Sequence, residues 1–83
     1  MNTTRNLTVA KLTPEKRIEL AILNYVEGKN DFDMAIKEIK LAMSNEFDKA
    51  KVDQALVACR RVLHNKPRFK EFIELLKGEG YIA

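Results

Sequence analysis

The chain has 83 residues, of which 46% are hydrophobic and 33% are charged, and its net charge is +3. This length accommodates one domain, and the composition is that of a globular protein rather than a disordered one. The single cysteine excludes an internal disulfide and favours a reducing compartment. No apolar run reaches the roughly 18 residues of a membrane span, and no signal peptide is apparent, so we expect a cytoplasmic protein.

The N-terminal segment differs from the rest of the chain. Residues 1–12 are polar, with Leu7 and Val9 as alternating apolar positions. This pattern predicts an N-terminal arm that either lies extended along the body or frays as a tail. Residues 13–83 form the expected single helical domain.

Capping signals divide the domain into four helices. Thr13 followed by Pro14 is a hydroxyl N-cap with proline at the first helical position, and Gly28 provides the stop. Asn30 or Asp31 is expected to cap the second helix, and Ser44 or Asn45 to open the third, with Glu46 and Asp48 in its first turn. The expected helices cover about 14–27, 31–43, 45–64 and 67–77. The sequence therefore predicts an all-α fold, either a compact four-helix bundle or an orthogonal helical array.

Each expected helix has an apolar face at a spacing of 100° per residue. These faces predict the core: Ile18, Ala21, Ile22 and Tyr25; Phe32, Ala35, Ile36, Ile39, Ala42 and Met43; Val52, Ala55, Leu56, Cys59, Val62 and Leu63; Phe69, Phe72, Ile73 and Leu76. The two aromatic residues of the last helix are spaced as core residues rather than as a platform for stacking bases.

Some apolar residues lie outside these faces. Leu20 and Leu23 make the first helix apolar almost all round, which is typical of a central, buried helix. Met34 and Leu41 lie together on the second helix, opposite its core face. Since two opposite faces cannot both point inward, a second apolar stripe indicates a contact surface. The predicted protein interface is therefore Leu20, Leu23, Met34 and Leu41, used for self-association or for a partner protein.

Positive charge is concentrated near the junction of the third and fourth helices, with six basic residues and one acidic residue over 51–70. Arg60, Arg61 and His64 suit the C-terminal end of a helix dipole, whereas basic residues at the start of the next helix oppose it. Three interpretations remain open: a solvated corner, a docking site for an acidic protein surface, and a phosphate-binding site. The candidate residues for an acidic partner or nucleic acid are Arg60, Arg61, Lys66, Arg68 and Lys70.

The second and third helices do not form a typical helix-turn-helix motif. Aligning Ala42 and Val52 with its small and apolar positions puts Glu46 where the turn glycine is expected. The basic residues lie at the far end of the would-be recognition helix, whereas base contacts normally come from its N-terminal part. This argues against reading of base sequence and leaves non-specific phosphate contact open.

Catalytic groups are sparse. His64 and Cys59 are the only histidine and cysteine, and they lie about 140° apart on one helix. We identify no glycine-rich phosphate loop and no cluster of metal ligands in the sequence. We therefore expect no enzyme, cofactor, metal or small-molecule substrate.

The sequence favours a small helical interaction protein that regulates or inhibits a partner protein by binding it, acting as a homo-oligomer. Proteins of this kind are encoded by phages and mobile elements. The alternative is a nucleic-acid-binding regulator that contacts phosphates through the basic residues at the junction of the last two helices.

Overall fold

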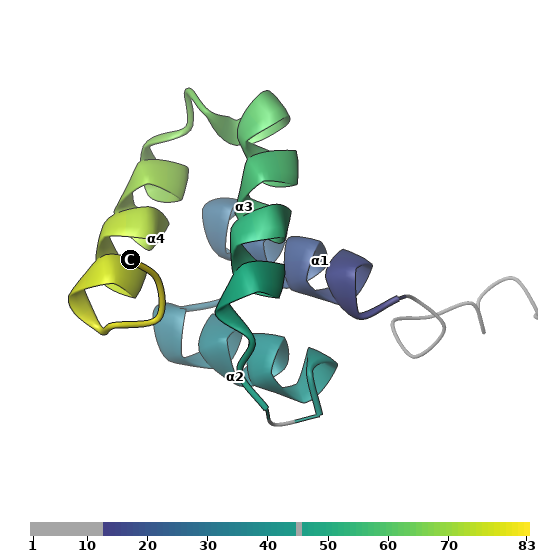
Figure 1. The fold of residues 1–83 in the computed structure, drawn as a ribbon. Coiled ribbons are helices and arrows are strands. Elements are labelled where there is room, and N and C mark those ends of the chain that lie inside the picture. The colour runs from purple at the N-terminus through teal and green to yellow at the C-terminus, as the bar shows by residue number, and fades with distance from the viewer. Residues whose placement is uncertain (1–12, 45) are drawn as a thin grey trace, which may run out of the picture.

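The computed structural model describes residues 13–44 and 46–83, and these form an all-α fold (Figure 1). The helices are α1 (Pro14–Val26), α2 (Phe32–Ala42), α3 (Lys49–Leu63) and α4 (Pro67–Gly78). α1 and α2 form one antiparallel hairpin, and the antiparallel hairpin of α3 and α4 crosses it steeply (Figure 1). The expected compact all-helical fold is confirmed, in its orthogonal form. The predicted arm, residues 1–12, lies outside the described residues.

α1 is the central helix, since it packs against each of the other three. α3 and α4 pack chiefly on α1 and only slightly on each other. The side chains at the centre are fully buried, among them Ile18 and Ile22 of α1, Ile39 of α2 and Phe72 of α4. The expected core role of the first helix is therefore confirmed, although Leu20 and Leu23 on its far side are only partly buried.

The first two helices begin at the predicted caps. The Thr13 Oγ1 accepts a hydrogen bond from the Lys16 N–H at 3.2 Å. The Asp31 Oδ1 accepts one from the Met34 N–H at 2.8 Å. Each side chain satisfies one of the backbone donors that a helix N-terminus leaves without a partner.

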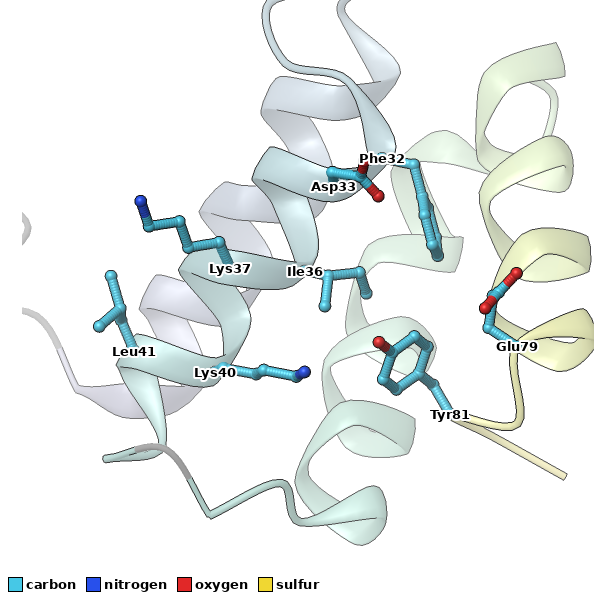
Figure 2. Close-up of a pocket in the computed structure, with 8 residues that line it drawn as sticks. All are labelled: Phe32, Asp33, Ile36, Lys37, Lys40, Leu41, Glu79 and Tyr81. Carbon is cyan, nitrogen blue, oxygen red and sulfur yellow. The ribbon is translucent and has the colours of Figure 1, made fainter.

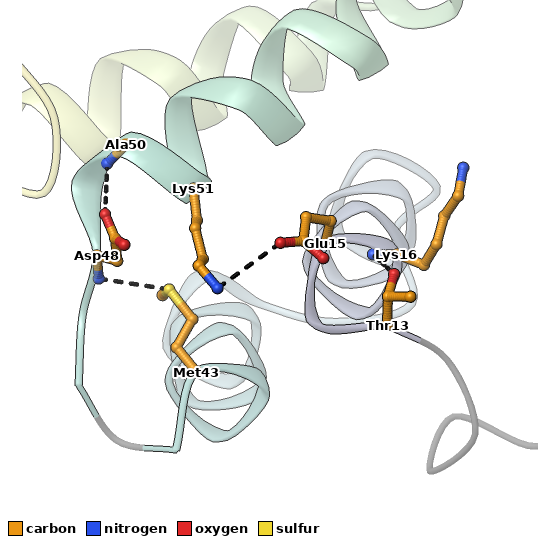
Figure 3. A network of polar contacts seen from close by, with 7 residues as sticks. All are labelled: Thr13, Glu15, Lys16, Met43, Asp48, Ala50 and Lys51. Carbon is orange, nitrogen blue, oxygen red and sulfur yellow. Dashed lines mark hydrogen bonds and ion pairs between the residues drawn. The ribbon is translucent and has the colours of Figure 1, made fainter.

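α3 begins later than predicted. The expected start at Ser44 or Asn45 is wrong, because Asp48 caps the helix with a 2.9 Å hydrogen bond to the Ala50 N–H. The Asp48 N–H in turn donates to the Met43 Sδ at 3.4 Å, so the cap is held against the end of α2 (Figure 3). Asp48, which was expected within the first turn, is thus the N-cap of α3.

Two helices end in a left-handed glycine followed by a backward hydrogen bond. Gly28 has φ +80° and Gly80 has φ +81°, a region that residues with a Cβ adopt at a cost. After Gly80, the Tyr81 N–H donates to the Leu76 carbonyl at 2.9 Å, and Ile82 is buried against the core. The tail therefore folds back on the last turn of α4.

Ser44 occupies the same position after α2 with φ 55°, where a glycine is favoured. Because the serine Cβ is strained in this region, we expect Ser44→Gly to raise the free energy of unfolding by about 0.5–1 kcal/mol. Urea denaturation followed by circular dichroism measures this change. A matched Ser44→Ala variant keeps the Cβ and should show no gain; equal stability of the two variants would contradict the argument.

One residue was wrongly assigned to the core. Val62 is 73% exposed, whereas Val52, Leu56 and Leu63 of the same helix are buried. Val62 lies at the edge of the apolar face of α3, about 80° from its centre. No other described helix covers that edge, because α3 packs mainly on α1. The valine therefore belongs to the surface described next.

Candidate protein-interaction surfaces

Large apolar side chains remain exposed on three adjoining helices. Met34 and Leu41 on α2 are 44% and 49% exposed, and Val62 on α3 is 73% exposed. Between these helices, Leu20 and Leu23 of α1 are partly buried and less exposed than any of these three. We call this set of five residues the apolar belt. It contains all four residues of the predicted interface and adds Val62.

The belt is continuous because Leu20 lines two neighbouring hollows. One lies between α1 and α2 and brings Leu20 together with Leu41. The other lies between α1 and α3 and is mostly apolar, with Leu20, Leu23 and Val62 in its lining. Met34 lines neither hollow and lies two turns from Leu41 on the outer side of α2. Three of the four predicted residues, Leu20, Leu23 and Leu41, thus lie on one connected surface.

Charges of both signs flank the belt. The Lys16 Nζ lies 3.5 Å from the Glu19 Oε1 at the hollow between α1 and α3. Arg17 and Glu38 line the hollow between α1 and α2. The Arg17 Nε is buried and has no hydrogen-bond acceptor among residues 13–44 and 46–83. A buried donor without an acceptor is costly, and a carbonyl or carboxylate from another chain would relieve that cost.

Most of the predicted basic residues lie free at the junction of α3 and α4. Arg60, Arg61, Lys66 and Lys70 are all exposed. The ion pairs formed within the described parts of the chain involve other cations. The charge of these four residues is therefore available to a ligand.

Arg68 differs from the other four because its side chain is bonded to α1. Its Nε donates to the Tyr25 carbonyl at 2.8 Å, and its guanidinium carbon lies 4.1 Å from the centre of the Tyr25 ring. The Tyr25 hydroxyl donates to the Glu71 Oε1 at 2.9 Å, and the Arg68 Nη1 lies 3.7 Å from the same oxygen. Burial and the bond to Glu71 raise the pKa of Tyr25. The three side chains fasten α4 to the C-terminal end of α1.

A further hollow lies between α2 and the C-terminal tail (Figure 2). Tyr81 packs against the rings of Phe32 and Phe47, with centroids 6.4 and 5.0 Å apart. The Lys40 Nζ lies 5.6 Å from the centre of the Tyr81 ring and points toward it, whereas Lys37 points away (Figure 2). These contacts anchor the tail on α2 and account for the aromatic residues gathered there.

The polar contacts near the start of α1 are also structural. The Lys51 Nζ lies 3.7 Å from the Glu15 Oε2 and joins α3 to the first turn of α1 (Figure 3). Both side chains are partly exposed to solvent, so this pair contributes at most about 1 kcal/mol. It orients the two helices at the end of the molecule where Thr13 and Asp48 supply their caps.

Cys59 and His64 lie in different environments. Cys59 is buried, and burial raises the pKa of its thiol to about 11, with a smaller contribution from Glu19. The thiol is therefore protonated at neutral pH and unsuited to nucleophilic attack. His64 is exposed at the end of α3. The described residues contain no group of three or more side chains placed to hold a metal ion.

Comparison with protein-family models, curated proteins and solved structures finds no match to this chain. None of the helices formed by the described residues is both long and apolar enough to cross a membrane. The described residues offer two candidate surfaces. One is the apolar belt on α1, α2 and α3, and the other is the group of exposed cations on α3 and α4.

Proposed function

We propose that this chain is a small non-enzymatic helical protein that self-associates through the apolar belt and regulates or inhibits a partner protein by binding it. The observation that carries the proposal is the continuity of the belt across three helices, with Leu41 and Val62 about half or more exposed at its two ends. Contiguous exposed apolar surface on a small domain is typical of a protein contact.

The charges beside the belt favour a second copy as the occupant. A two-fold interface places the same patch on both chains, so it must be complementary to itself. Lys16 and Arg17 lie beside the belt together with Glu19 and Glu38, so each sign on one copy can face the opposite sign on the other. The Arg17 Nε, which has no acceptor among the residues that the structure describes, gains one in such a pair.

We also propose that the protein is cytoplasmic, which suits its free cysteine. A buried thiol with a raised pKa is stable under reducing conditions and makes no covalent contribution to assembly. The mobile-element origin is proposed from the small size and the lack of a catalytic set.

Replacing Met34 and Leu41 together with aspartate tests the proposal. Both side chains are exposed, so the monomer should keep its fold, while two carboxylates buried in an interface should weaken self-association by about a hundredfold. Light scattering after size-exclusion chromatography measures the mass, and circular dichroism measures the helix content.

Val57→Asp is the matched control, since it also replaces an exposed apolar residue with aspartate; Val57 is 59% exposed on α3 and lines neither hollow of the belt. We expect it to keep the mass of the unsubstituted chain. Val62→Asp, on the other end of the belt, should act like the double variant. If the double variant unfolds the monomer, or leaves its mass unchanged, the belt is not the interface.

A further inference from the structure

The cleft between α3 and α4 is a second surface, separate from the apolar belt. Both helices pack on α1 and only slightly on each other, so a groove remains between them. Its floor is formed by Leu56 and Ile82, which are buried, and its apolar sides by Val57 and Ile73. Val57 is 59% exposed although it is a large apolar residue in mid-helix.

The walls of the groove carry positive charge on both sides. Arg60 of α3 and Lys77 of α4 line it directly. On α3, Val57 is followed by Arg60, Arg61 and His64 at the i+3, i+4 and i+7 positions of one exposed stripe. On α4, Ile73 lies between Lys70 and Lys77 in the same way. α3 and α4 run antiparallel (Figure 1), and the apolar Val57 and Ile73 line the groove together with the basic Arg60 and Lys77.

Acidic groups near the groove are few. Asp53 lies at the end where α3 begins, and Glu74 is exposed beside the α4 stripe. The ion pairs among residues 13–44 and 46–83 leave Arg60, Lys70 and Lys77 without a carboxylate partner. Lys77 lies toward the end of the groove where Asp53 is, whereas Arg60 and Lys70 lie toward the loop between α3 and α4 and make that end positive.

The positive charge there is partly unfavourable to the fold itself. Lys66 is the N-cap of α4 and makes no side-chain capping bond, and the first turn of α4 contains no acidic residue. Cations at this end oppose the helix dipole and so destabilise the helix slightly. Residues that work against their own helix indicate a role outside folding.

From this groove we infer that α3 and α4 bind an acidic amphipathic helix of a partner protein, with its apolar side chains on Val57 and Ile73 and its carboxylates on Arg60, Lys70 and Lys77. The α3 stripe from Asp53 to His64 extends about 16 Å, which matches about three turns of a ligand helix.

The apolar centre favours a peptide over nucleic acid. A phosphate backbone makes no favourable contact with an exposed valine, and bases stack only on exposed aromatic rings. Phe69 and Phe72 of α4 are buried at 1% and 0% exposure, so they offer no such platform. A helix with carboxylates beside an apolar face matches both the apolar centre of the groove and its basic walls.

The test uses three fluorescein-labelled synthetic helices of about 14 residues. The first carries leucines on one face and glutamates beside them, the second keeps the leucines but has glutamines, and the third keeps the glutamates but has serines. Fluorescence anisotropy at about 100 mM salt should show the first binding at least about tenfold more tightly than either of the others, because each lacks one of the two contributions.

Two protein variants separate the two contributions. Arg60→Glu with Lys70→Glu should weaken binding of the first helix by about tenfold or more. Val57→Ser should weaken the first helix but not the third, since it removes only apolar contact. Lys49→Glu is the matched control, because it reverses a charge on the same helix outside the groove, and it should change the affinity little.

The outcomes are distinct from those of the self-association test. Met34→Asp with Leu41→Asp disrupts the belt and should leave peptide binding unchanged, because the belt does not line the groove. Failure of the first helix to bind overturns the inference. Equal binding of the first and third helices, together with equally tight binding of duplex DNA, would make the surface a general anion site and overturn it as well.

Discussion

Phe72→Ala is expected to lower the free energy of unfolding at 25 °C by about 3–5 kcal/mol. Phe72 is fully buried, and its ring lies 4.9 Å from the ring of Tyr25 and 5.6 Å from that of Phe32, measured between centroids. Removing a buried phenylalanine costs about 3–5 kcal/mol, through lost burial and the cavity that remains. A domain of this size has a total stability of about 4–12 kcal/mol, so the loss is a large share of it.

Urea denaturation monitored by circular dichroism measures the effect. Phe72→Leu keeps most of the buried volume and should cost less than half as much as Phe72→Ala. If Phe72→Ala lowers the free energy of unfolding by less than about 1 kcal/mol, the joint between α1, α2 and α4 is not the centre of the fold.

Arg68→Lys should lower the free energy of unfolding by about 1–2 kcal/mol, even though it keeps the charge. Lysine cannot place a planar guanidinium over the Tyr25 ring while donating to the Tyr25 carbonyl. The substitution also removes the arginine nitrogen that approaches the carboxylate of Glu71. A charge-only role for Arg68 predicts no loss, whereas the observed geometry predicts a clear one.

Lys70→Arg provides the matched control for this experiment. Lys70 is exposed two residues further along α4, and its exchange should change stability by less than about 0.5 kcal/mol. Equal stability of Arg68→Lys and the unsubstituted chain would show that the contact with α1 is dispensable. Arg68 would then rejoin the free basic residues at the junction of α3 and α4.

The sequence was sufficient to predict the helices, because their signals are local. Thr13 and Asp31 cap α1 and α2 through bonds within one turn, and Gly28 lies in the left-handed region that ends a helix. The start of α3 was predicted too early because several capping residues compete between Ser44 and Asp48. The choice of Asp48 is associated with its contact to Met43, which depends on how α2 and α3 meet.

The candidate surfaces were only partly predictable for the same reason. Leu20, Leu23, Met34 and Leu41 follow from helical periodicity, since they lie opposite or beside the core faces. Val62 did not, because its exposure depends on which edge of α3 is left uncovered by α1. The internal contacts of Arg68 join residues 43 positions apart along the chain, and no local pattern indicates them.

Sedimentation equilibrium of the unsubstituted chain, over a range of concentrations, tests the central claim most directly. A monomer has a mass of 9.6 kDa. If the apolar belt joins two copies, the weight-average mass should rise with concentration toward twice that value, and Met34→Asp with Leu41→Asp should abolish the rise. A mass that stays at 9.6 kDa up to about millimolar concentration, where even weak pairs associate, would contradict self-association through the belt.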